Sequence, residues 1–220
     1  MIELKNVSKI YKNGNECTKA ADKIDLTIQD GEFVAIMGTS GSGKSTLLNI
    51  IGCMDELTEG EYFLNHEAVH GKKMKSLHKI RRDNISFVFQ NFALMNHYSV
   101  YENVEVPLIA QKIKKKERKR IIEEKLKLLG IYELKDKLPT KISGGQQQRC
   151  AIARALAADN AIILADEPTG ALDKKTGQEI IDILIDIHKT QKKTVIIVTH
   201  DENVASKADR IIWIEDGKIC

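Results

Sequence analysis

The fold is decided by the stretch FVAIMGTSGSGKSTLLNII, which occupies residues 33–51. It opens with five apolar residues, Phe33–Met37, a run typical of a strand buried on both faces. A glycine-rich segment follows, and its residues from Gly38 to Ser45 fit the pattern G-x-x-x-x-G-K-[ST]. The apolar run Leu47–Ile51 then predicts a helix. Strand, loop and helix in this order are the context that a phosphate-binding loop requires.

The chemistry of this loop follows from its residue types. Glycines let the backbone curl, so that successive N–H groups point at phosphate oxygens, and the helix that follows directs its positive end to the same place. Lys44 can neutralise the β and γ phosphates, while Ser45 can ligate Mg²⁺. We therefore expect a nucleoside triphosphate and Mg²⁺ to bind the loop residues Gly38, Ser40, Gly41, Ser42, Gly43, Lys44, Ser45 and Thr46.

The rest of the chain predicts an α/β architecture. Alternating patterns at Ile2–Val7 and Ile24–Ile28, with a turn at Asn13–Asn15 between them, indicate half-buried strands near the N-terminus. Nearly continuous apolar runs predict buried strands that alternate with helical segments, which implies a parallel sheet with crossovers. Those runs are Phe33–Met37, Ile85–Phe89, Ala161–Ala165 and Thr194–Val198. Residues 91–159 show helical periodicity instead, so we expect a helical subdomain (91–159) inserted into an α/β core formed by residues 1–90 and 160–220.

A pair of carboxylates ends one of the buried runs. Asp166 and Glu167 directly follow Ala161–Ala165. We expect Asp166 to hold the Mg²⁺ shell and Glu167 to polarise the attacking water as general base. Strands often end in acidic residues, so this pair gains its weight from the phosphate loop on the same predicted sheet.

Composition excludes several other classes of protein. A net charge of +3 and an aromatic content of 5% argue against nucleic acid as a partner. No apolar run approaches the roughly 20 residues that cross a bilayer, and no signal peptide is recognisable at the N-terminus. Four dispersed cysteines without a CxxC pair favour reduced thiols, and hence a cytoplasmic protein.

A second motif resembles that of a known family. Ile142-Ser143-Gly144-Gly145-Gln146 is similar to the LSGGQ signature of ATP-binding cassette (ABC) ATPases, with Ile142 in place of the usual Leu. The resemblance implies the P-loop NTPase (RecA-like) fold: a mostly parallel sheet core, an N-terminal antiparallel β subdomain and an inserted helical subdomain. It also implies that residues Ser143, Gly144, Gly145 and Gln146 contact the nucleotide of a second subunit.

The same resemblance assigns four further residues. Gln90 resembles the Q-loop glutamine, expected to contact Mg²⁺ or water, and Asp173 lies in a segment similar to the D-loop. His200 resembles the switch histidine that contacts the γ-phosphate. Tyr11 stands where the family places an aromatic ring that stacks on adenine, although a packing role at a strand end is the alternative.

Finer features resemble the MacB/LolD-like subgroup, which serves macrolide export, lipoprotein release and antimicrobial-peptide resistance. They are DEPTGALD (166–173), GCMD (52–55) and NVEVPL (103–108). The resemblance implies an ATPase subunit on the cytoplasmic face of the membrane, forming an ATP-dependent homodimer and powering a separate permease of FtsX/MacB type.

Two alternatives remain open at this point. One is a division-complex regulator that signals through an FtsX-like partner without transport. The other is a chromosome-organising ATPase, although the interval between Gly43 and the signature has no sustained heptads. The basic segment Lys112–Arg120 is either a solvated helix face or a contact with anionic lipid headgroups.

Overall fold

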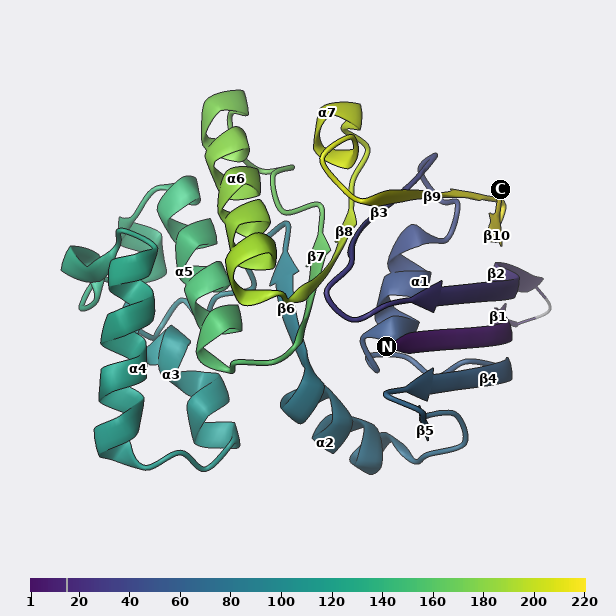
Figure 1. The fold of residues 1–220 in the computed structure, drawn as a ribbon, viewed down its shortest axis with the longest axis horizontal. Coiled ribbons are helices and arrows are strands. Elements are labelled where there is room, and N and C mark those ends of the chain that lie inside the picture. The colour runs from purple at the N-terminus through teal and green to yellow at the C-terminus, as the bar shows by residue number, and fades with distance from the viewer. Residues whose placement is uncertain (15) are drawn as a thin grey trace. The chain divides into compact units, whose positions relative to one another are not determined.

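The computed structural model describes residues 1–14 and 16–220 and divides them into two compact units. One unit contains Met1–Arg81 together with Ile187–Cys220, and the other contains Arg82–Asp186. The elements of both are drawn in Figure 1. The division expected from the sequence, a core of residues 1–90 and 160–220 with an insertion of 91–159, stays a prediction.

The first unit contains an antiparallel sheet of four strands in the order β2-β1-β4-β5. Strand β1 lies between β2 and β4, with Ile2 paired to Ile28 on one side and to Leu64 on the other. The two predicted N-terminal strands are confirmed and are longer than expected, while the predicted turn Asn13–Asn15 includes Asn15, which lies outside the described residues. The strands are β1 (Ile2–Asn13), β2 (Glu16–Ile28), β4 (Glu59–Leu64) and β5 (Glu67–Ala68).

The same unit contains the parallel strands that carry the phosphate loop. Strand β3 (Phe33–Gly38) pairs in parallel with β8 (Thr194–Val198) and with β9 (Arg210–Glu215), and β10 (Lys218–Ile219) adds antiparallel to β9. Every residue of β8 is buried, as expected of a strand covered on both faces. Helix α1 (Lys44–Ile51) packs against β3 and β8, and the short α7 (Glu202–Ala205) packs against β3.

The second unit is mainly helical and contains one strand pair. Strands β6 (Ile85–Phe89) and β7 (Ile162–Asp166) run parallel, and α5 packs against β6, α3 and α4. The predicted strand Ala161–Ala165 is thus displaced by one residue. The helices of this unit are α3 (Val100–Ala110), α4 (Lys115–Leu128) and α5 (Gly144–Ala157), with short 3-10 turns at Tyr132–Leu134 and Pro139–Lys141. Two more helices, α2 (Met74–Asn84) and α6 (Lys174–Gln191), each have residues in both units.

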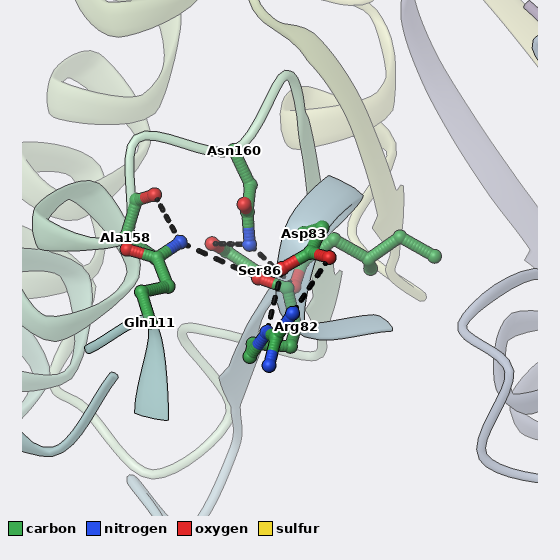
Figure 2. A network of polar contacts seen from close by, with 7 residues as sticks. Arg82, Asp83, Ser86, Gln111, Ala158 and Asn160 are labelled. Carbon is green, nitrogen blue, oxygen red and sulfur yellow. Dashed lines mark hydrogen bonds and ion pairs between the residues drawn. The ribbon is translucent and has the colours of Figure 1, made fainter. Parts of the chain in front are cut away.

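A polar network joins the helices of the second unit to its strand pair (Figure 2). The Gln111 side chain donates to the carbonyl oxygens of Ala158 at 2.8 Å and Arg82 at 3.4 Å. Asn160, just before β7, donates to the Ser86 hydroxyl at 3.3 Å, and Ser86 donates to the end of α5. Buried polar groups need such partners, so the network anchors α3 and α5 at the amino ends of β6 and β7.

The basic segment Lys112–Arg120 lies in and before α4. The Arg118 guanidinium donates to Glu105 at 2.8 Å, and Arg120 pairs with Glu117 and Glu124. Intramolecular partners therefore take up part of its charge. Among the described residues, no helix is long and apolar enough to cross a bilayer.

Candidate nucleotide-binding site

The loop between β3 and α1 has a backbone that requires glycine at two places. Gly38 and Gly43 have φ angles of +152° and +103°. A Cβ at Gly43 would lie 2.1 Å from the Ala20 carbonyl oxygen, and one at Gly38 would lie 2.1 Å from the Ile214 carbonyl oxygen. The N-cap residue of α1, Gly43, makes no side-chain capping hydrogen bond, so the first N–H groups of the helix suit an anion.

Two polar side chains of this loop fit a polyphosphate. The Lys44 ammonium is nearly buried and donates to the carbonyl oxygens of Gly38 at 2.9 Å and Thr39 at 2.6 Å, so the cation lies against the loop. The Ser42 hydroxyl is buried without a hydrogen-bond partner. Because an unsatisfied buried hydroxyl is costly, the loop supplies both a cation and a free donor where a phosphate would lie.

The first unit also brings His200 and Tyr11 to this region. The Thr199 N–H donates to the Ile36 carbonyl at 3.2 Å. Because β3 and β8 are parallel, their carboxyl ends meet at one edge, and His200 and Gly38 both lie there. Tyr11, near the end of β1, is 42% exposed and donates its phenolic hydrogen to Asp55 at 2.6 Å.

The second unit brings Gln90 and the two carboxylates together. Phe89 pairs with Asp166 across β6 and β7, so Gln90 follows one strand and Glu167 the other. The Gln90 amide packs so tightly on Gly170 that a Cβ there would lie 2.6 Å from its Nε2 atom. Glu167 has a φ angle of +43°, a conformation that costs about 1–3 kcal/mol and is concentrated at functional sites.

The signature segment forms the start of α5. Ser143 is its N-cap: its hydroxyl accepts from the Gln146 N–H at 3.4 Å, and its own N–H donates to the Gln146 side chain at 3.0 Å. A Cβ at Gly145 would lie 2.4 Å from the Thr176 Cγ2 atom. Gly144, the residue before it, packs against Leu172. The start of α5 therefore closely approaches the segment that leads into α6.

Asp173 begins α6. Its carboxylate accepts from the Thr176 N–H at 3.1 Å. Hydrogen bonds from Thr176 hold the pKa of the Asp173 carboxyl below its usual value. Since Thr176 also meets Gly145, the predicted D-loop and the predicted signature share one neighbour within the second unit.

Sequence reasoning missed two residues that hold predicted site residues, or their chain neighbours, in place by hydrogen bonds. Gln148, fully buried on α5, donates to the Pro168 carbonyl at 2.6 Å and more weakly to the Phe89 carbonyl at 3.4 Å. It therefore links α5 to the residue after Glu167 and to the residue before Gln90. Asp55 anchors Tyr11. Asp55 lies in the segment GCMD (52–55) quoted above for the subgroup, but no local signal shows that either residue supports the site, because each acts through contacts distant in sequence.

The donor set bears on the metal. The described residues contain no group of three or more His, Cys, Asp and Glu side chains arranged to hold an ion. The residues expected to serve are Ser45 of the first unit and Gln90 and Asp166 of the second. Mg²⁺ is commonly held by one or two protein oxygens, with phosphates and water completing its shell, so hydroxyl, amide and carboxylate oxygens are donor types that suit Mg²⁺.

A glycine-rich phosphate-binding loop between a buried parallel strand and a helix defines the class of P-loop NTPases with an α/β fold. The chain matches the family described as "ABC transporter" over residues 21–170 and belongs to that family. It is 50% identical over its whole length to the ABC transporter ATP-binding protein MJ0796 of Methanocaldococcus jannaschii, of which 95% is covered.

Two further comparisons refine the subgroup and the fold. Macrolide export ATP-binding/permease protein MacB 2 of Yersinia pestis bv. Antiqua is 45% identical over the whole chain, which spans 32% of that larger protein. A solved dimer of MJ0796, in a post-hydrolysis state bound to ADP and Pi, has a TM-score of 0.93, is 48% identical and is covered to 96%. The chain is an ATP-binding, ATP-hydrolysing subunit of the MacB/LolD-like subgroup.

Proposed function

We propose that the chain forms an ATP-dependent, head-to-tail homodimer that powers a separate membrane permease for export, lipoprotein release or antimicrobial-peptide resistance. The observation that carries the proposal is its likeness, over the whole chain, to a dimeric cassette bound to ADP and Pi. The match to one third of MacB 2, which is named as an ATP-binding/permease protein, supports a permease as the partner. These relatives do not favour the division-regulator alternative. The subunit then lies on the cytoplasmic face, held by its permease.

The proposed roles on ATP follow the residue chemistry. N–H groups of Gly38–Thr46 and the Lys44 ammonium bind the phosphates, and Tyr11 stacks on adenine. Ser45, Gln90 and Asp166 hold Mg²⁺, which when bound neutralises charge on the β and γ phosphates. His200 contacts the γ-phosphate. The dimer partner supplies the contacts from its own signature and D-loop, at Ser143, Gly144, Gly145, Gln146 and Asp173.

Glu167 carries the proton transfer in this scheme. Its carboxylate accepts a proton from the water whose oxygen bonds to the γ-phosphorus. The bond from that phosphorus to the β–γ bridging oxygen breaks, and ADP leaves with the electron pair. The left-handed backbone at Glu167 supports this role, because strain of this kind is concentrated at functional sites.

The permease contact is proposed at residues 92–98, after Gln90. Two side chains hold this segment in shape: Arg154 donates to the carbonyls of Phe92 at 3.0 Å and Ala93 at 2.6 Å, and buried Asn103 bonds to both backbone groups of Met95. Met95 and Tyr98 are exposed. A segment that is fixed yet presents apolar side chains suits a docking surface.

The test of the proposed function is Glu167→Gln. The change removes the proton acceptor but keeps the phosphate loop, so ATP hydrolysis should fall by about 10²–10⁴ while ATP still binds. Unhydrolysed ATP should then hold two subunits together. Size-exclusion chromatography should show a dimer with ATP and a monomer with ADP.

A matched control is Glu117→Gln on the exposed face of α4, where the carboxylate pairs with Arg120 on the surface. It should behave as wild type. A Glu167→Gln protein that binds ATP yet stays monomeric, or hydrolyses at the wild-type rate, would contradict both the base assignment and the ATP-bound dimer.

A further inference from the structure

The ring of Tyr11 is held by two side chains from separate parts of the chain. Its hydroxyl donates to Asp55 Oδ2 at 2.6 Å, and Asp55 lies in the loop after α1. Lys9, two residues before Tyr11 on β1, donates to Asp55 Oδ1 at 2.6 Å and to the Glu56 carbonyl at 2.6 Å. A single carboxylate therefore ties both the ring and the lysine.

The lysine also covers the ring itself. Its Nζ atom lies 4.9 Å from the centroid of the Tyr11 ring, within the distance of a cation–π interaction. The Lys9 side chain is only 12% exposed, whereas Tyr11 is 42% exposed. With one face of the ring against the ammonium, a planar ligand has the other face on which to stack.

The protonation states of Asp55 and Tyr11 are defined at neutral pH. Burial alone would raise the pKa of Asp55, but hydrogen bonds from Lys9, Tyr11 and the Glu56 N–H outweigh it and hold that pKa below its usual value. Burial, and then the bond to Asp55, raise the pKa of Tyr11. The phenol therefore stays protonated and donates to an ionised carboxylate.

We infer that Asp55, together with Lys9, is a positioning residue for the nucleotide base: it fixes the Tyr11 ring at the angle at which adenine stacks. The inference rests on the proposed role of Tyr11 as the base platform. Without the tether, the ring would have to be ordered again each time a nucleotide binds. Ordering one side chain on binding corresponds to about a three- to tenfold loss of affinity.

The decisive variant is Tyr11→Phe. It keeps an aromatic face for adenine and loses only the hydroxyl that reaches Asp55. If stacking area alone mattered, affinity would be unchanged; the tether predicts a loss of about three- to tenfold. Asp55→Ala should show a similar loss of ATP affinity, and the double variant Tyr11→Phe/Asp55→Ala should bind ATP no more weakly than either single variant. Asp55→Asn keeps an acceptor oxygen and should bind ATP more tightly than Asp55→Ala.

The measurements are dissociation constants for ATP and for inorganic tripolyphosphate, by calorimetry. Tripolyphosphate binds the phosphate loop without a base, so its affinity should be unchanged in all these variants. The matched control is Glu32→Gln, which breaks a comparable ion pair with Arg210 and should leave every value at wild type.

Three results would overturn the inference, and they are distinguishable. An equal loss for tripolyphosphate would make Asp55 a structural support of the loop. Normal ATP affinity in both Tyr11→Phe and Asp55→Ala, with a loss in Tyr11→Ala, would remove the tether and leave the platform standing. Normal ATP affinity in Tyr11→Ala would refute the proposed stacking role itself.

Discussion

Replacing Gly170 by alanine should displace Gln90 without touching the phosphate loop. Gly170 lies in the turn after Glu167, and its backbone has no positive φ, so alanine is conformationally allowed there. The added Cβ would lie 2.6 Å from the Gln90 Nε2 atom and 3.1 Å from its Cδ atom. A side-chain amide can move aside more easily than the backbone, so the substitution should act on Gln90.

The size of the effect follows from these distances. Ordinary contact with a Cβ begins at 3.4 Å, and the Gln90 amide must therefore retreat by about 0.8 Å. A misplacement of about 1 Å in a positioned group can cost about 10²-fold in rate. We expect kcat for ATP hydrolysis to fall about 10- to 10²-fold, with ATP affinity within twofold of wild type, because the Lys44 loop is unchanged.

The assay is phosphate release at saturating ATP, combined with nucleotide titration and thermal unfolding. Gly177→Ala is the matched control: its Cβ would lie 3.3 Å from Thr169, close to ordinary contact, and kcat should be unchanged. Adding Gly170→Ala to Gln90→Ala should cause no further loss, since the displaced amide is already absent. A wild-type kcat for Gly170→Ala, or an additive loss in the double variant, would refute the reasoning.

Three further predictions concern stability and reactivity. Asn103→Ala removes a buried amide that donates to three carbonyls and accepts one N–H, so it should destabilise the fold by about 2–4 kcal/mol in denaturant titration. Because the pKa of Asp173 is lower in the folded than in the unfolded state, its ionised carboxylate stabilises the folded state at pH values above the unfolded pKa of about 4. The wild type should therefore melt at a higher temperature than Asp173→Asn near neutral pH, and this difference should vanish as the pH falls from about 5 through the folded-state pKa of Asp173. A difference that persists at low pH would contradict the prediction. Ellman's reagent at pH 8 should modify the exposed thiols of Cys17 and Cys220 quickly. It should modify Cys53 and Cys150 slowly, because burial raises the pKa of Cys53 to about 11 and that of Cys150 to about 12.

Several features of the chain could be predicted from residues alone because their causes are local. The run Phe33–Met37, the glycines after it and the helix that follows lie within 19 consecutive residues, 33–51, and both the apolar pattern and the phosphate chemistry can be recognised there. The capping pattern at Ser143 and Gln146 is likewise complete within four positions. Strand β7 was expected one residue too early, at Ala161–Ala165, because apolar character extends beyond the backbone pairing that starts with Ile162.

Other features were decided only by tertiary structure. Residues 59–84 gave no expectation, yet they form β4, β5 and α2; β4 takes its place by pairing with β1, where a Cβ on Gly60 would lie 2.3 Å from the Asn6 carbonyl oxygen. The contact of Gln90 with Gly170 and the bond of Tyr11 to Asp55 join residues far apart in sequence. Sequence periodicity reports which face of an element is apolar, whereas the partner of a polar side chain depends on which elements pack together. Short motifs in the sequence therefore identified the side chains expected to bind and hydrolyse the nucleotide. Which residues hold those side chains in place was decided by packing between segments that are distant in sequence.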